Sequence, residues 1–127
     1  MITDTWIKDI AKVCHEANRA LCQAFGDNSQ QSWEQSPEWQ QHSAIDGVNA
    51  ILHKQVNGPA DSHNSWMAQK IEEGWRLGAK KDVEKKLHPC LVSFDRLFPE
   101  QQAKDYVFFA VASCLISQRH NTPRNEL

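Results

Sequence analysis

The sequence predicts a compact all-α domain of about four helices, joined in its second half by one long ordered loop that holds one short extended segment. Three observations support this fold class. Apolar residues recur at helical spacing, proline and glycine stand where helices start and stop, and no internal repeat is visible. A length of 127 residues fits a single domain, so we assign residues 1–127 to one unit that ends in a polar tail at 119–127.

The first predicted helix runs from Trp6 to Ala24. Asp4 or Thr5 can cap its amino end, and Gly26 supplies the left-handed residue that commonly ends a helix. Its apolar positions are spaced by three or four residues and form one face of the helix. They are Trp6, Ile10, Val13, Ala17, Leu21 and Ala24.

A second helix is expected after the polar loop 27–35. Ser36, Pro37 and Glu38 read as an N-cap, a first-turn proline and a first-turn acid, and Asn57-Gly58-Pro59 ends the segment. The predicted buried side comprises Trp39, Ile45, Val48, Ile51 and Leu52, and we expect Trp6 and Trp39 to be the core tryptophans.

The second half of the chain predicts two more helices. One starts at Asp61 or Ser62 and ends at Gly74; the other opens at Pro99 and is apolar on nearly all sides, which suits a central helix or a dimer surface. Between them, residues 75–94 lack helical periodicity, and 90–92 form the predicted extended segment. A long irregular segment inside a compact domain is usually functional.

Composition excludes several classes of protein. A net charge of −2 and a pI near 6.3 argue against a nucleic-acid binder. The chain has no apolar run near the ~20 residues that cross a bilayer, and its first residues are acidic, so we expect a cytoplasmic protein without a membrane partner. Four cysteines without a Cys-x-x-Cys pair predict buried thiols, no metal site and no cofactor.

Charge is distributed unevenly along the chain. Residues 1–62 hold 4 Lys/Arg against 8 Asp/Glu, a balance of −4, whereas residues 63–127 hold 10 against 8, a balance of +2. Four lysines, at positions 80, 81, 85 and 86, fall within seven residues. An anionic ligand would favour this half, although such a run is also typical of a solvated surface.

A specific series of residues in this half matches a known pattern. It consists of His63-x-x-Trp66, Lys70, Gly74-Trp75-x-x-Gly78, Lys81-Asp82, Lys85-Lys86-Leu87-His88-Pro89 and Leu97. The series resembles the ryanodine-receptor repeat, the RyR domain. Upstream residues resemble the amino-terminal extension of small bacterial and phage proteins with one such repeat, so the resemblance spans roughly Ile7 to Ser117.

The resemblance implies a mostly helical binding or assembly module. It also has departures, because Leu77, Ala79 and Phe94 stand where the family commonly has tyrosine, proline and tyrosine. In the calcium-release channels the repeats occur as tandem pairs, and in such a pair two His-x-x-Trp elements can face one cleft. A single-repeat protein could rebuild that pair as a homodimer.

The residues themselves suggest a binding site for a planar anion. On a helix, His63, Trp66 and Lys70 share one face, so that an aromatic plane lies between a switchable donor and a cation. Stacking of one base on one aromatic ring stabilises the complex by roughly 1–3 kcal/mol, which alone gives only weak binding. A ligand site therefore needs a second surface that contacts the other side of the base. The predicted ligand-binding residues are His63, Trp66, Lys70, Trp75, Lys80, Lys81, Lys86 and His88.

We therefore expect a non-catalytic module that binds a nucleotide-like small molecule at a homodimer interface. One alternative is a protein assembly module without a small ligand, and a weaker one is an enzyme that modifies a nucleotide. Cys14 and His15 are neighbours in sequence but should diverge on a helix, so we predict no catalytic residue. Simpler structural roles also remain open: Trp66 in the core, His63 as a cap, His88 bonded to backbone, and Gly74 and Gly78 as helix stop and turn.

Overall fold

The computed structural model describes residues 5–121, and within this range it confirms the predicted all-α architecture. In chain order the elements are α1 (Thr5–Ala24), the 3-10 turn η1 (Trp33–Gln35), α2 (Glu38–Leu52), α3 (Pro59–Glu72), β1 (Arg76–Leu77), β2 (Leu87–His88), the 3-10 turn η2 (Phe94–Arg96) and α4 (Pro99–Asn121). None of the helices in this range is long and apolar enough to cross a membrane.

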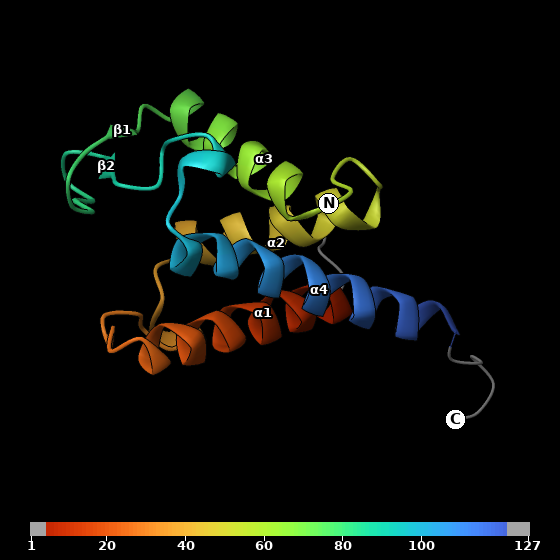
Figure 1. Cartoon of the computed structure of the whole chain (residues 1–127). Coiled ribbons are helices and arrows are strands. Elements are labelled where there is room, and N and C mark those ends of the chain that lie inside the picture. Colours follow the sequence, from red (N-terminus) through yellow and green to blue (C-terminus); the bar gives the residue numbers. More distant parts are fainter. Residues whose placement is uncertain (1–4, 122–127) are drawn as a thin grey trace.

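Helix α4 is the central element of the bundle. It runs alongside α1 on one side and contacts α2 and α3 on the other, while the small sheet projects beyond one end of the helices (Figure 1). The near-continuous apolar character of α4 follows from this position, because it faces three helices. The helix continues to Asn121, so the predicted polar tail is helical over its first residues; residues 122–127 lie outside the described range.

The core lies between α1, α2 and α4. Its buried members are Ile7, Ile10, Ala11, Cys14, Trp33, Val48, Ile51, Val56, Ala112 and Ile116. The buried face of α1 differs from the predicted one, because Ala11 and Cys14 are inside while Val13 is exposed. Small side chains at these positions let α1 approach α4 closely, and the Cys14 thiol lies 3.7 Å from the backbone oxygen of Phe108.

Two helices end with the same backbone arrangement around a glycine. At the end of α1, Gly26 has φ +86°, and the amides of Gly26 and Asp27 donate to the carbonyls of Gln23 and Cys22. At the end of α3, Gly74 has φ +96°, and the amide of Trp75 donates to the carbonyl of Lys70. Both glycines were predicted as helix stops, and both adopt the left-handed conformation that this role requires.

Two boundaries in the second half differ from the prediction. Helix α3 begins at Pro59 rather than at Asp61 or Ser62, since proline is well suited to a first-turn position; the Asp61 carboxylate instead accepts a hydrogen bond from the Asn57 amide at 3.2 Å. The extended segment lies at 76–77 and 87–88, not at 90–92. These two short strands pair in parallel, Arg76 with Leu87 and Leu77 with His88.

Candidate ligand-binding cleft

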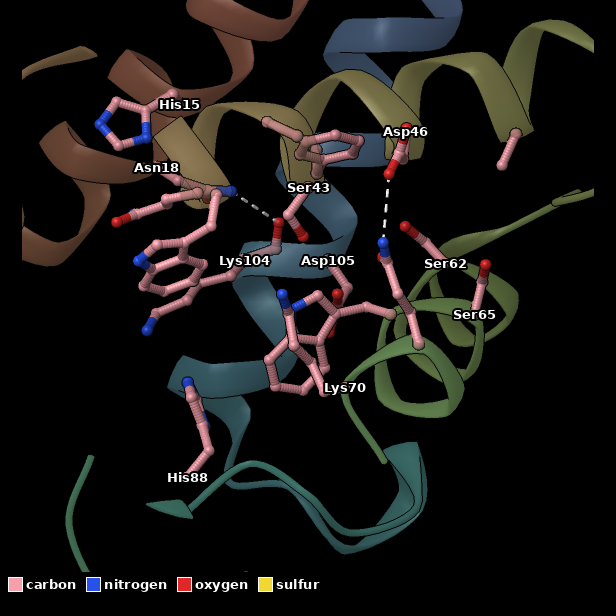
Figure 2. Close-up of a pocket in the computed structure, with 18 of the residues that line it drawn as sticks. His15, Asn18, Ser43, Asp46, Ser62, Ser65, Lys70, His88, Lys104 and Asp105 are labelled. Carbon is pink, nitrogen blue, oxygen red and sulfur yellow. Dashed lines mark hydrogen bonds between the residues drawn. The ribbon is translucent and has the colours of Figure 1, made fainter. Parts of the chain in front are cut away.

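A cleft of about 280 Å³ opens among the helices, and residues of all four helices and of the segment 75–88 line it (Figure 2). Its size is close to the lower end of the range typical for small-molecule sites, about 300–1,000 Å³. Lys70 of α3 lies in it near Asp105 of α4, with His88 below them (Figure 2), and Trp66 of α3 also lines it. The cleft therefore joins an aromatic surface to charged groups.

The aromatic surface comes from three tryptophans and a histidine. Trp66 lies edge-on to His88 with ring centroids 4.9 Å apart, and Trp75 lies 6.2 Å from the same histidine. Trp39 of α2 packs against Trp75 at 5.8 Å. Trp75 is buried, while Trp39 is 37% exposed. Aromatic rings that line a concave site offer the apolar, planar contacts that ligand bases use.

The placement of Trp39 differs from its predicted role in the core. Because α2 begins at Glu38, Trp39 stands in the first turn of the helix, away from the buried cluster around Val48 and Ile51. From there its ring meets Trp75 and two lysines of the cleft. The sequence pattern places Trp39 on the apolar side of α2 but cannot tell core from cleft along that side.

Three lysines contribute positive charge to the cleft. The Lys70 ammonium lies 5.0 Å from the centroid of the Trp39 ring and that of Lys81 lies 5.6 Å from it, while Lys104 lines the cleft from α4. Lys70 is only 3% exposed and donates to Glu73 at 3.2 Å. Burial lowers the pKa of Lys81, and the charges of Lys104 and Lys70 lower it further. A neighbouring anion would relieve this repulsion.

The cleft also offers hydrogen-bond acceptors. Gln69 donates to Asp46 at 3.1 Å, which leaves carboxylate capacity free at the α2 wall (Figure 2). Near α1, the Asn18 amide donates to the carbonyl of Lys104 at 3.1 Å, and its oxygen is buried without a partner in the described part of the protein. Cations and acceptors together suit a ligand that carries both an anionic group and hydrogen-bond donors.

His88 presents a neutral donor to the cleft. The Cys90 amide donates to its Nδ1 at 3.0 Å, which puts the ring proton on Nε2. Burial lowers the pKa of His88 to about 4, and the charges of Lys81, Lys104 and Lys70 add to the effect. The ring is therefore uncharged near neutral pH. The hydrogen bond to backbone also matches the structural role that the sequence allowed for this residue.

Acidification should destabilise the protein through His88. Because the pKa of His88 is lower in the folded state than its ordinary value of 6.5, the unfolded chain binds more protons between pH 6.5 and about 4, and stability falls as pH falls through this window. One such group contributes a slope of up to about 1.4 kcal/mol per pH unit. Chemical denaturation across this range should show the loss, and His88→Asn should flatten that part of the profile. An unchanged profile in the variant would contradict this role.

The structure brings five of the eight predicted site residues together. Trp66, Lys70, Trp75, Lys81 and His88 line the cleft. The other three lie outside its lining. His63 is buried behind Trp66, with ring centroids 5.6 Å apart. Lys80 is exposed on the loop, and Lys86 donates to the carbonyl of Glu73 at 2.8 Å, where its charge suits the carboxyl end of α3.

Several cleft residues were not predicted from the sequence. Asn18 and Phe108 come from helices that look purely structural in sequence, and Asp46 is an ordinary exposed acid of α2. Lys104 and Asp105 carried little signal, because they follow the polar first turn of α4 and directly precede its apolar run. In the sequence they look like ordinary solvent-exposed charges near a helix start.

Comparison with protein families identifies the RyR domain over residues 43–116, which is more than half of the chain. The chain belongs to the RyR domain family. The matched residues contain most of the cleft, from Trp66 through Lys81 and His88 to Lys104 and Asp105. Trp39 and helix α1 precede the match, so this RyR domain is joined to an amino-terminal segment that contributes one wall of the cleft.

Proposed function

We propose that this RyR domain is a non-catalytic module that binds a planar, anionic, nucleotide-like small molecule in the cleft and thereby senses or sequesters it. The observation that carries the proposal is the position of Lys70, a buried cation held against the face of Trp39 inside a cleft that Trp66 also lines. A base can stack on such aromatic surface while its phosphate meets the ammonium groups.

The geometry supports a site within one chain. From the sequence we expect a second aromatic surface opposite Trp66, supplied by the other subunit of a homodimer. In the structure Trp39 of α2 supplies aromatic surface from the same chain as Trp66 and Trp75. We therefore propose one ligand per chain, with homodimerisation as a separate property that calorimetric stoichiometry and sedimentation can resolve.

Cysteine chemistry supports a reducing compartment. All four cysteines are free thiols, but the prediction of buried thiols is right only for Cys14 and Cys22, because Cys90 is half-buried and Cys114 is exposed. Disulfides are rare where glutathione keeps thiols reduced, as in the cytoplasm of a bacterium. We place the protein there as part of the proposal.

A second candidate function is assembly with a partner protein. Phe98, the residue before α4, is 70% exposed, and Tyr106 of α4 is 57% exposed and packs against Phe94. Apolar side chains that gather on a surface are typical of interaction sites. This candidate needs no small ligand and uses residues outside the cleft.

Paired variants separate the two candidates. Trp66→Ala should weaken a bound adenine nucleotide by about 1–3 kcal/mol, or about five- to 150-fold, while Phe98→Ala should leave its affinity unchanged. The measurement is calorimetric titration and thermal unfolding with linear, cyclic and ribosylated adenine nucleotides. A ligand at about 100 times its dissociation constant adds roughly 2.7 kcal/mol to the stability.

Four outcomes would count against the proposal. A panel without any stabilising nucleotide would reject the nucleotide class, and equal binding by the Trp66→Ala variant would reject the cleft. Loss of a self-association in Phe98→Ala, without ligand binding in the parent, would favour assembly. Mass spectrometry of the recovered nucleotide would detect turnover, and a product would make the protein an enzyme.

A further inference from the structure

A buried histidine and a carboxyl group meet behind the aromatic surface. His63 of α3 is 3% exposed, and its Nε2 donates to the carbonyl of Val92 at 2.7 Å. A carbonyl oxygen can only accept, so this hydrogen bond assigns a proton to Nε2. The other ring nitrogen, Nδ1, lies 3.6 Å from Oδ2 of Asp105. The side chain of Asp105 is 20% exposed and lines the cleft.

This arrangement favours one proton between the two groups. With that proton the pair is either a neutral histidine beside a protonated carboxyl or an imidazolium beside a carboxylate, and both forms have zero net charge. Without it, the lone pair of Nδ1 faces a partly buried carboxylate. Burial raises the pKa of Asp105 to about 7, although Lys104 opposes the shift. The Asp105 carboxyl group therefore gains or loses a proton near neutral pH.

The other titratable and charged groups of the cleft come from every element that lines it. Besides Asp105, they are His15 and Cys22 of α1, Asp46 of α2, Lys70 of α3, Lys81 and His88 of the loop, and Lys104 of α4. The low pKa of His88 keeps that ring neutral, and burial raises the pKa of the nearby Cys90 thiol, which keeps it protonated. The lysines supply positive charge, which favours the carboxylate form of Asp105.

We propose that the Asp105–His63 pair takes up a proton when an anion binds to the lysines of the cleft, so that the protein binds its ligand together with a proton. An anion neutralises the field that favours carboxylate at Asp105 and adds repulsion of its own, and both effects favour the protonated pair. The inference rests on the proposed function only in placing an anion beside Lys70, Lys81 and Lys104.

Linkage between proton binding and anion binding determines how the affinity for an anion depends on pH. Because the bound state holds one more proton, affinity for an anion falls as pH rises through about 7, by up to tenfold per pH unit between the midpoints of the free and bound protein. Replacement of Asp105 by asparagine keeps the size and shape of the side chain but removes the exchanging group. Asp105→Asn should therefore lose the part of the pH dependence that the Asp105 carboxyl group contributes.

The test uses sulfate as the probe, because sulfate stays a dianion throughout this range and needs no assumption about a nucleotide. The midpoint of the assigned Asp105 carboxyl carbon is followed by NMR in sulfate and in chloride at equal ionic strength. We expect a midpoint near 7 in chloride and a higher one in sulfate. Glu100→Gln, which removes an exposed carboxylate of the same helix outside the cleft lining, should preserve the sulfate effect.

The two midpoints test two different parts of the proposal. A midpoint in the ordinary range for aspartate would overturn the shared proton, and a midpoint that sulfate leaves unchanged would overturn the coupling. Both measurements are made on the unmodified protein, so neither depends on the folding of a variant. If sulfate shifts the midpoint while every nucleotide fails to bind, the proton coupling stands and the nucleotide proposal fails.

Discussion

Replacing Gly78 by alanine is expected to destabilise the protein by about 1–3 kcal/mol and to weaken anion binding by about tenfold or more. A Cβ at position 78 would lie 2.7 Å from Cβ of Leu87, closer than two such atoms approach in proteins. The clash falls where the Gly78 amide donates to the carbonyl of His88 at 3.3 Å. Relief of the clash must separate the two strands, and with them Lys81 and His88.

Gly58→Ala is the matched control for this substitution. A Cβ there meets no atom within 4 Å, and its φ of 179° is extended backbone that alanine also adopts. Chemical denaturation gives the change in stability, and sulfate titration gives the change in affinity. If Gly78→Ala retained both the stability and the affinity of the parent, the close approach of the strands would not position the loop.

The role of Gly78 shows what local sequence patterns can and cannot predict. The sequence suggested that Gly74 and Gly78 serve the stop and the turn after a helix. Gly74 does so, because a helix end is a local event whose positive φ the residue itself satisfies. Gly78 instead makes room for Leu87, nine positions later, next to the parallel pairing of the two strands. Parallel strands are not joined by a hairpin turn, so the sequence contains no local turn signal for this pairing.

The helices were predictable for the same local reason. Their apolar spacing, first-turn prolines and closing glycines act within a few residues, and α1, α2, α3 and α4 all appear near their expected positions. The face that each helix buries was less predictable. Val13 is exposed and Cys14 buried because the approach of α1 to α4 depends on the size of side chains on both helices.

The cleft required tertiary structure. Trp66, Lys70 and Trp75 could be grouped from sequence, since they lie on one helix and its immediate end. Trp39 and Asp105 could not, because they reach the site from α2 and α4, at separations of about thirty residues on either side. Whether a second aromatic ring reaches the cleft from the same chain depends on the packing of α2 against the loop, which local patterns do not encode.

Lys70→Met is expected to have opposite effects on stability and on binding. The Lys70 ammonium is buried against Trp39 with Glu73, itself partly exposed, as the carboxylate that it contacts. Because the Glu73 carboxylate is partly exposed and can be hydrated after the change, an apolar side chain of similar length at position 70 should leave the stability unchanged or raise it. Loss of a charge-assisted contact should at the same time weaken anion binding by about 1.5–3 kcal/mol, or roughly ten- to 150-fold.

Lys80→Met is the matched control, because Lys80 carries the same charge on the exposed loop but does not line the cleft. Both variants lose one positive charge from the molecule, so any difference between them isolates the local contact from the long-range field. Denaturation and sulfate titration at two ionic strengths measure the two effects. Equal losses of affinity in both variants would mean that the cleft attracts anions through its general field, and that the buried position of Lys70 serves the fold alone.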